Sequence, residues 1–298
     1  MQQQSTDRNL FELFSKIRQN NHLRKKDKSK WLNYLNLSMR HFSWGQTLLH
    51  SFVKKDKSAS IHLSFRDLWS LADEHGFLED AVLDTVLNDC FQDQKKIGYI
   101  ETSVFNAIEN PFFSETTTTP FKNDKDAYIA VKNLNGNHWI FVFLNFKDKT
   151  LYVVDPQRDD VLIETSNKIL KAFQEVHHNK MNLEASQTSK WNFINDAWKI
   201  ATIDHNVQYD GCNCGIYCIK YALKIKKEFP VKPPYLFVGK NFNDARQLYT
   251  ALLLNSSKPK QLETGKNKPK DANSSSKSIG EEGLVTTKRK RKKKKRTK

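Results

Sequence analysis

The sequence predicts an α+β fold with a mostly antiparallel central sheet flanked by helices. Three apolar segments with strand character, residues 127–133, 138–146 and 151–156, follow one another closely. The polar segment 145–149 has the length of a hairpin turn, so the last two strands should pair in antiparallel fashion. Helical patterns come before and after this group of strands and do not alternate with them, which is typical of α+β proteins.

The flanking helices are marked by capping residues and by apolar spacing. Ser64 can cap a helix that begins at Phe65, and apolar residues continue at helical spacing between 77 and 87. Residues 201–208 predict a last strand that leads into the turn before Cys214. Further helical patterns occupy residues 169–176, 214–223 and 242–254.

The net charge of +16 is distributed unevenly along the 298 residues. Residues 1–58 hold 12 Lys and Arg against 4 acidic residues, residues 256–298 hold 16 against 4, and residues 59–255 hold 21 against 25. We therefore expect a basic N-terminal extension (1–58), a slightly acidic central domain (59–255) and a polybasic tail (256–298). The tail has almost no apolar residues and should be disordered.

The polybasic tail contains nine consecutive cations, Lys288–Arg296. Because such a run repels itself, it predicts a partner rather than a structural role: an importin, and hence the nucleus, or a nucleic acid. No apolar signal segment precedes the four cysteines, and the longest apolar run, Trp139–Leu144, is six residues, too short to span a membrane. We expect a reducing intracellular compartment.

Cys214 has the sequence context of a nucleophilic cysteine. A polar turn, residues 208–213, leads into it, and Gly215 and an apolar helical run follow it. This order places the thiol at a helix N-terminus, where backbone N–H groups and the helix dipole favour the thiolate that attacks a carbonyl carbon. Gly215 should leave the thiol uncovered and let a substrate backbone approach it.

A nucleophilic cysteine needs a base, a group that orients the base, and a donor for the oxyanion. His138 begins one strand of the predicted hairpin and Asp155 ends the other, so the carboxylate can reach the imidazole. Gln208, six residues before Cys214, can point its amide N–H at the oxyanion. We expect the catalytic site to consist of His138, Asp155, Gln208 and Cys214.

Other histidines and cysteines fit this chemistry less well. His177 and His178 look like a helix end, and His205 has no strand–turn partner although it is closer to Cys214 in sequence. The pattern C-x-C-x3-C of residues 212–218 has no fourth ligand nearby and is not a zinc pattern, so neither a metal nor another cofactor is expected.

Four residue types occur in an order and at spacings that are specific for one kind of cysteine peptidase. His138 is followed by Trp139, Asp155 comes 17 residues after the histidine, and Gln208 begins a Q-x5-C-G segment that opens a helix. This order resembles the ubiquitin-like-protein-specific proteases, the Ulp/SENP family, within clan CE of the cysteine peptidases. Adenovirus-type proteases and bacterial effectors share this clan, so the resemblance leaves a viral or bacterial member open. It implies the papain-like fold of the clan.

The resemblance covers residues 60–255 and implies a substrate site beside the catalytic residues. Phe77, in place of a family tryptophan, and Trp139 would be two aromatic walls that admit only a Gly-Gly tail. Phe77 has an alternative interpretation as an ordinary core residue. Asn213, where the family usually has aspartate, would lie near the substrate tail without its charge.

The function that the resemblance implies is a thiol isopeptidase that cleaves after the C-terminal Gly-Gly of ubiquitin, NEDD8 or SUMO. The acidic balance of residues 59–255 favours ubiquitin or NEDD8 slightly. Three alternatives remain. The first is an acetyltransferase effector with the same triad, which would be translocated into a host cell if the protein is bacterial. The second is a viral maturation protease of the adenovirus kind, and the third is a nonenzymatic nucleic-acid adaptor.

Overall fold

The computed structural model describes residues 2–52, 60–108, 125–158, 160–183, 197–230 and 235–261. The helices are α1 (Gln2–Gln19), α2 (Lys25–Ser38), α3 (Phe65–Ala72), α4 (Asp80–Phe91), α5 (Thr102–Ile108), α6 (Ile163–Leu183), α7 (Cys214–Glu228) and α8 (Phe242–Ser256). The strands are β1 (Thr47–Phe52), β2 (Ser60–Ser64), β3 (Ile97–Ile100), β4 (Ala127–Leu134), β5 (His138–Asn145), β6 (Thr150–Val154), β7 (Lys199–Ala201), β8 (Asp204–His205), β9 (Tyr235–Leu236) and β10 (Ser257–Pro259).

The central sheet has the strand order β3-β4-β5-β6-β7. Its middle is antiparallel as predicted, because β5 pairs in antiparallel fashion with both β4 and β6, whereas β3 and β7 add parallel edges. The predicted hairpin between β5 and β6 is confirmed: the backbone N–H of Lys147 donates to Asn145 Oδ1 at 3.1 Å, and Lys149 turns the chain with a φ of 48°. The α+β fold class is confirmed, with a sheet that is mixed at its edges.

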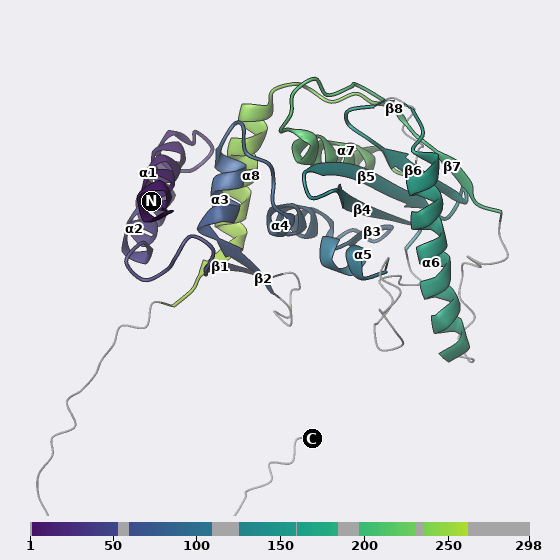
Figure 1. The fold of residues 1–298 in the computed structure, drawn as a ribbon, viewed down its shortest axis with the longest axis horizontal. Helices are drawn as coiled ribbons and strands as arrows, with labels where there is room; N and C mark the ends of the chain where they lie inside the picture. Colours follow the sequence, from purple (N-terminus) through teal and green to yellow (C-terminus); the bar gives the residue numbers. More distant parts are fainter. Residues whose placement is uncertain are drawn as a thin grey trace, which may run out of the picture. The chain divides into compact units, whose positions relative to one another are not determined.

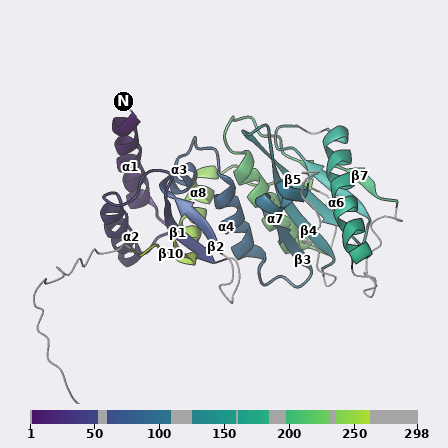
Figure 2. The same ribbon diagram turned by 60° about the horizontal axis from the view of Figure 1, so that its bottom comes forward.

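Side chains of β5 alternate between the two faces of this sheet. Trp139, Phe141 and Phe143 belong to the core that includes α4 and α7, and the residues between them belong to a second core with α5 and α6. Figure 2 shows α7 and α6 on opposite sides of the sheet. Because both faces are covered, β5 is a continuous apolar run. The start of β5 lies against α7, where Trp139 contacts Cys214 and Cys218.

The capping prediction for α3 is confirmed. The Ser64 side chain accepts from the backbone N–H of Asp67, and the Asp67 carboxylate accepts from the backbone N–H of Ser64, which is a complete capping box. Phe77 lies outside any helix, because α4 begins only at Asp80. The segment from Asp73 to Glu79 therefore connects α3 to α4 as a loop.

The N-terminal segment shares the core of the central domain expected at residues 59–255. Leu13 and Ile17 of α1 and Trp31 and Leu35 of α2 are buried in the same core as α3, α7 and α8, and Figure 1 shows α1 and α2 beside α3 and α8. Asn20 Nδ2 donates to the carbonyl of Gln247 in α8 at 2.9 Å. Residues 1–262 accordingly form one compact unit.

A three-stranded sheet, β10-β1-β2, crosses both expected domain boundaries. Strand β10 lies in the segment expected to be a disordered tail; it needs no apolar side chains because its pairing with β1 uses backbone groups. Tyr34 Oη contacts the carbonyl oxygens of Leu48 at 2.9 Å and Lys260 at 3.1 Å, and so ties α2 to this sheet.

The rest of the predicted tail, with Lys288–Arg296, lies outside the described residues. None of the described helices is both long and apolar enough to cross a membrane.

Leu13→Ala tests whether the N-terminal helix is part of the core. Leu13 is fully buried, so we expect the substitution to lower the free energy of unfolding by about 2–5 kcal/mol. Phe11→Ala on the same helix removes a side chain that is 72% exposed and should cost no more than about 0.5 kcal/mol. Urea unfolding followed by circular dichroism measures both. Equal, small losses would mean that α1 is only loosely docked.

Candidate active site

Cys214 is the first residue of α7, as the sequence predicts. The turn before it is held by Asp210, whose Oδ1 accepts from the backbone N–H groups of Cys212 at 3.0 Å and Asn213 at 2.8 Å. Burial opposes ionisation of Asp210, but these N–H groups outweigh it and lower the pKa of the carboxyl. The nucleophile therefore follows a turn that is fixed by hydrogen bonds of its own.

Two sulfur contacts join α7 to the start of β5. The backbone N–H of Trp139 donates to Cys214 Sγ at 3.4 Å, and Cys218 Sγ donates to the carbonyl of Trp139 at 3.6 Å. Cys214 and Cys218 are one helical turn apart and lie on the same face of α7. Cys214 is buried, with 1% of its surface exposed, and its sulfur faces the strand that begins with His138.

The structure gives a packing reason for a glycine at position 215. A Cβ built on Gly215 would lie 3.0 Å from Cβ of Leu78, so this glycine lets α7 pack against the loop between α3 and α4. The expectation that Gly215 keeps the thiol open to a substrate backbone stays a prediction, and the contact with Leu78 is a second reason for glycine at this position. The sequence carries no direct signal for this contact, which joins residues far apart in the chain.

The hairpin brings His138 and Asp155 together. Continuing the pairing of β5 with β6 past Phe141–Val154 places Asp155 opposite Ile140, diagonal to His138. His138 Nε2 lies 2.6 Å from Asp155 Oδ1. The other ring nitrogen, Nδ1, is buried and has no hydrogen-bond partner within the part of the chain that the structure describes. The thiol of Cys214 also interacts with the His138 ring and raises its pKa.

The electrostatics of this pair favour a protonated imidazole. Burial alone would lower the pKa of His138, but the hydrogen bond to Asp155 and the interaction with Cys214 outweigh it and raise the pKa to about 9. Burial likewise opposes ionisation of Asp155, but His138 and the backbone N–H of Gln157 outweigh it and lower the pKa of Asp155. An imidazolium held by a carboxylate, beside a thiol, is the arrangement that favours a thiolate.

Gln208 is near the site but turned to another partner. Its backbone N–H donates to the carbonyl of Pro156, the residue after Asp155, at 2.6 Å. Its amide Nε2 lies 2.7 Å from the carbonyl oxygen and 3.0 Å from Oδ1 of Asp210. The structure thus brings Gln208 beside the catalytic turn, with its amide donors on Asp210 and not directed at an oxyanion position.

The predicted substrate residues differ in their surroundings. Trp139 is 4% exposed and its indole N–H donates to the carbonyl of Leu78 at 2.8 Å, which fixes the ring beside the Phe77 loop. Phe77 is 49% exposed, so the alternative that it is a core residue is wrong. Asn213 is buried and its Oδ1 accepts from Arg246, so its side chain is a structural tie and not an exposed substrate contact.

His205, set aside as a catalytic residue, contacts the site in another way. Its Nε2 lies 2.8 Å from the carbonyl oxygen of Asp155 and its Nδ1 lies 2.8 Å from the carbonyl oxygen of Ile203. It therefore fixes the backbone of Asp155. The side chains of His177 and His178 lie outside the residues whose side chains are described.

Arg246 in α8 is a residue that the sequence analysis missed. Its side chain is 2% exposed and reaches the turn before Cys214. The signal in the sequence that could have identified Arg246 is its place on the helix face shared with Tyr249, Thr250 and Leu253, all of which are buried.

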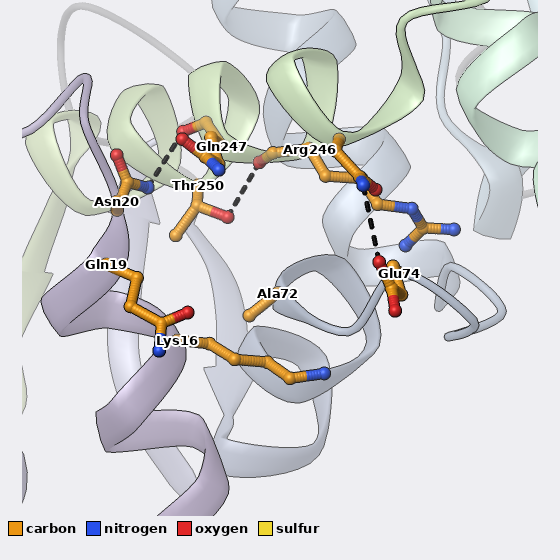
Figure 3. Close-up of a pocket in the computed structure, with 9 residues that line it drawn as sticks. Lys16, Gln19, Asn20, Ala72, Glu74, Arg246, Gln247 and Thr250 are labelled. Atoms are coloured by element: carbon orange, nitrogen blue, oxygen red, sulfur yellow. Dashed lines mark hydrogen bonds between the residues drawn. The ribbon is translucent and has the colours of Figure 1, made fainter.

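Figure 3 shows Arg246 and Glu74 at one end of a pocket of about 280 Å³ between α1, α3 and α8. None of the predicted site residues lines this pocket.

Comparison with known proteins identifies the family. Residues 81–251, more than half of the chain, match the model of the Ulp1 protease family, C-terminal catalytic domain. No curated protein sequence matches the chain.

Two solved structures show the same fold. The X-ray structure of the C-terminal Ulp1 protease domain in complex with Smt3, the yeast ortholog of SUMO, is 17% identical, covers 80% of this chain and 97% of its own, and has a TM-score of 0.53. The SUMO protease Ulp1 with its catalytic cysteine oxidized to a sulfenic acid is also 17% identical, covers 79% and 97%, and has a TM-score of 0.53. The chain therefore belongs to the Ulp1 protease family and is a cysteine peptidase with the α+β fold of that family.

Proposed function

We propose that this chain is a thiol isopeptidase that cleaves after the C-terminal glycine of a ubiquitin-like modifier, with Cys214, His138 and Asp155 as its catalytic triad. The observation that carries the proposal is the geometry at the start of α7: His138 Nε2 lies 2.6 Å from Asp155 Oδ1, and the thiol of Cys214 interacts with the same ring, whose other nitrogen, Nδ1, is buried. Each of the three side chains comes from a different element that the fold brings to one point.

In the first half of the reaction, His138 Nδ1 holds the proton of the Cys214 thiol and the thiolate attacks the glycine carbonyl carbon. The carbonyl oxygen becomes an oxyanion. His138 then gives its proton to the departing lysine amine as the C–N bond breaks, which leaves a thioester on Cys214. Asp155 keeps the proton on Nε2 throughout, so Nδ1 alone exchanges protons with the reacting atoms.

In the second half, His138 Nδ1 removes a proton from water, and the resulting hydroxide attacks the thioester carbonyl. The C–S bond breaks, the modifier leaves as a carboxylic acid that ionises in water, and the proton taken from water stays on the His138–Cys214 pair. The backbone N–H of Cys214 is one oxyanion donor, since the first N–H groups of a helix have no intrahelical acceptor. The Gln208 amide is the second, after it exchanges one of its two contacts with Asp210 for the oxyanion.

Selection for glycine follows from the rings near the nucleophile. Trp139 is fixed by the Leu78 carbonyl and Phe77 is exposed on the adjacent loop position. A substrate tail that passes these rings to reach the Cys214 sulfur must lack bulky side chains. The side-chain oxygen of Asn213 is bound by Arg246, so we do not assign this side chain to the selection of glycine.

The modifier that we propose is of the SUMO class. The support is that both solved relatives described above are SUMO proteases, one of them in complex with Smt3. The acidic balance of residues 59–255 opposes this, because it favours the arginine-bearing tails of ubiquitin or NEDD8. A partner for the polybasic tail, an importin or a nucleic acid, and a nuclear location remain proposals from Lys288–Arg296 alone.

A turnover panel tests this proposal. SUMO, ubiquitin and NEDD8, each with a fluorogenic amine on its C-terminal glycine, are incubated separately with the full chain. We expect the largest kcat/KM for SUMO. Faster cleavage of ubiquitin or NEDD8 would overturn the choice of modifier but keep the isopeptidase. No cleavage of any modifier, together with acetyl transfer from acetyl-CoA, would replace the isopeptidase by an acetyltransferase.

Gln208→Ala tests the second oxyanion donor. We expect kcat to fall by about 10²–10³-fold, because the side-chain donor to the oxyanion is lost while the nucleophile stays in place. Gln92→Ala, at an exposed position after α4, is the matched control and should leave kcat within about twofold. A loss of less than about threefold in Gln208→Ala would assign the oxyanion to backbone groups only.

The pH dependence of turnover follows from the raised pKa of His138. The imidazolium must protonate the leaving amine, so activity should fall on the alkaline side with a midpoint near the His138 pKa of about 9. Asp155→Asn removes the carboxylate that raises this pKa, so its alkaline midpoint should move to lower pH. Profiles of kcat/KM against pH for both proteins measure the shift. An unmoved or higher midpoint would contradict the assignment of Asp155.

A further inference from the structure

Three large aromatic side chains are exposed beside the turn that leads into the nucleophile. Tyr235 and Phe237 are 48% and 55% exposed, and Tyr209 is 88% exposed. The rings of Tyr235 and Phe237 are stacked, with centroids 5.5 Å apart and 19° between their planes. Single exposed apolar residues are ordinary on a protein surface, whereas a contiguous group of them indicates an interaction site. We call Tyr209, Tyr235 and Phe237 the aromatic stripe.

Strand pairing holds two of these rings outward. β9 pairs in parallel fashion with β8, and Tyr235 lies opposite Asp204. Leu236, between Tyr235 and Phe237, is fully buried, whereas its two neighbours are exposed. Because side chains alternate between the two faces of a strand, the burial of Leu236 fixes both aromatic rings on the solvent side. The exposure of these rings is therefore a consequence of the fold.

The two segments stay side by side beyond the strands, as far as Tyr209. The backbone N–H of Val238 donates to Asn206 Oδ1 at 2.9 Å. Two residues after Val238, Lys240 Nζ lies 5.6 Å from the centroid of the Tyr209 ring. The stripe therefore follows the chain that leads into the catalytic turn, and it ends where that turn begins.

The turn before the nucleophile adjoins exposed aromatic side chains at both of its ends. At its start, Tyr209 directly follows Gln208, the proposed oxyanion donor. At its other end, Cys212 Sγ donates to the carbonyl of Glu74 at 3.6 Å, and Glu74 belongs to the loop that carries Phe77. A substrate that lies across the nucleophile can therefore contact Phe77 at one end of the turn and the stripe at the other.

We propose that the aromatic stripe binds the protein whose lysine carries the modifier, through apolar side chains and a carboxylate next to that lysine. An isopeptide substrate has two parts, and the proposed function assigns Phe77 and Trp139 to the glycine tail of the modifier. The stripe, at the other end of the turn, offers the second part a surface of aromatic side chains, the kind that contributes most to binding at interfaces. Lys240 is exposed beside Tyr209 and supplies a positive charge for the carboxylate. This inference rests on the proposed function.

The test compares the cleavage of three SUMO substrates by the full chain. Two carry a peptide on an isopeptide-linked lysine, with leucines and a glutamate beside that lysine in one peptide and serines in their places in the other. The third carries a fluorogenic amine and no peptide. We expect the wild-type kcat/KM to be about tenfold higher for the leucine peptide than for the serine peptide, since aromatic contacts at the centre of an interface contribute at least this factor.

Phe237→Ser should remove the preference for the leucine peptide and keep the turnover of the fluorogenic amine, which has no peptide to bind. Tyr235→Ser removes the other ring of the stacked pair and should have the same effect. Phe11→Ser, which replaces an exposed phenylalanine on α1, is the matched control and should keep the tenfold preference.

Two results would overturn the inference. One is an absent preference in the wild type, or a preference that both stripe variants retain. The other is a loss in the stripe variants that is equal for all three substrates, because the stripe would then bind the modifier. If the wild type cleaves none of the three, the proposed function itself is refuted, and the inference with it.

Discussion

Replacing Cys214 with alanine is expected to abolish turnover and to leave modifier binding intact. The substitution removes the only atom that forms the proposed thioester, and removing a nucleophile of this kind costs at least about 10⁴-fold in kcat. Alanine is smaller than cysteine and favours helix, so α7 should still begin at residue 214. Single-turnover cleavage and equilibrium binding to the modifier, measured on the same preparation, separate the two effects.

Cys90→Ala is the matched control for this variant. Cys90 is a free thiol in α4 that lies outside the site, so its replacement should leave kcat within about twofold of the wild type. Full activity in Cys214→Ala would show that another group is the nucleophile. Loss of both binding and turnover would require a check of folding by circular dichroism before the nucleophile is assigned.

His138→Ala is expected to lower kcat by about 10³–10⁴-fold. The substitution removes the base that takes the thiol proton and the acid that protonates the leaving amine, and each such role contributes about 10²–10⁴-fold. It also leaves Asp155 without its partner at 2.6 Å. Added imidazole should restore part of the activity, because a small base can occupy the space that the side chain leaves.

His22→Ala controls for the general effect of losing a histidine. His22 is exposed in the loop between α1 and α2, far along the chain from the hairpin, and kcat should stay within about twofold. A His138→Ala variant that retains more than about a tenth of the wild-type kcat would exclude His138 as the base. Steady-state kinetics with the modifier that the wild type cleaves fastest provide both values.

The parts of the site that the sequence predicted are those fixed by local structure. A short polar turn between two apolar strands determines the hairpin, and the hairpin alone brings Asp155 to His138. The start of α7 follows in the same way from a polar turn and an apolar helical run, so Cys214 was placed correctly at a helix N-terminus. Spacing along the chain is sufficient in these cases because the partners are few residues apart or joined by one turn.

The parts that escaped prediction depend on contacts between distant segments. Arg246 lies 33 residues from Asn213 and 170 residues from Gly76, and it binds mostly backbone carbonyls, which every residue has. The contact of His205 with the Asp155 carbonyl is of the same kind. The contact of Gly215 with Leu78 could not be known from the sequence either. Backbone acceptors and packing partners leave no pattern in the order of residues.

The most direct test of the thiol isopeptidase is covalent capture. SUMO, ubiquitin and NEDD8, each carrying a C-terminal electrophile, are mixed with the wild type and with Cys214→Ala, and adducts are located by intact mass and peptide mapping. We expect a one-to-one adduct of the wild type with SUMO, attached at Cys214, and no adduct of the variant. An adduct on another residue, or equal labelling of both proteins, would contradict it.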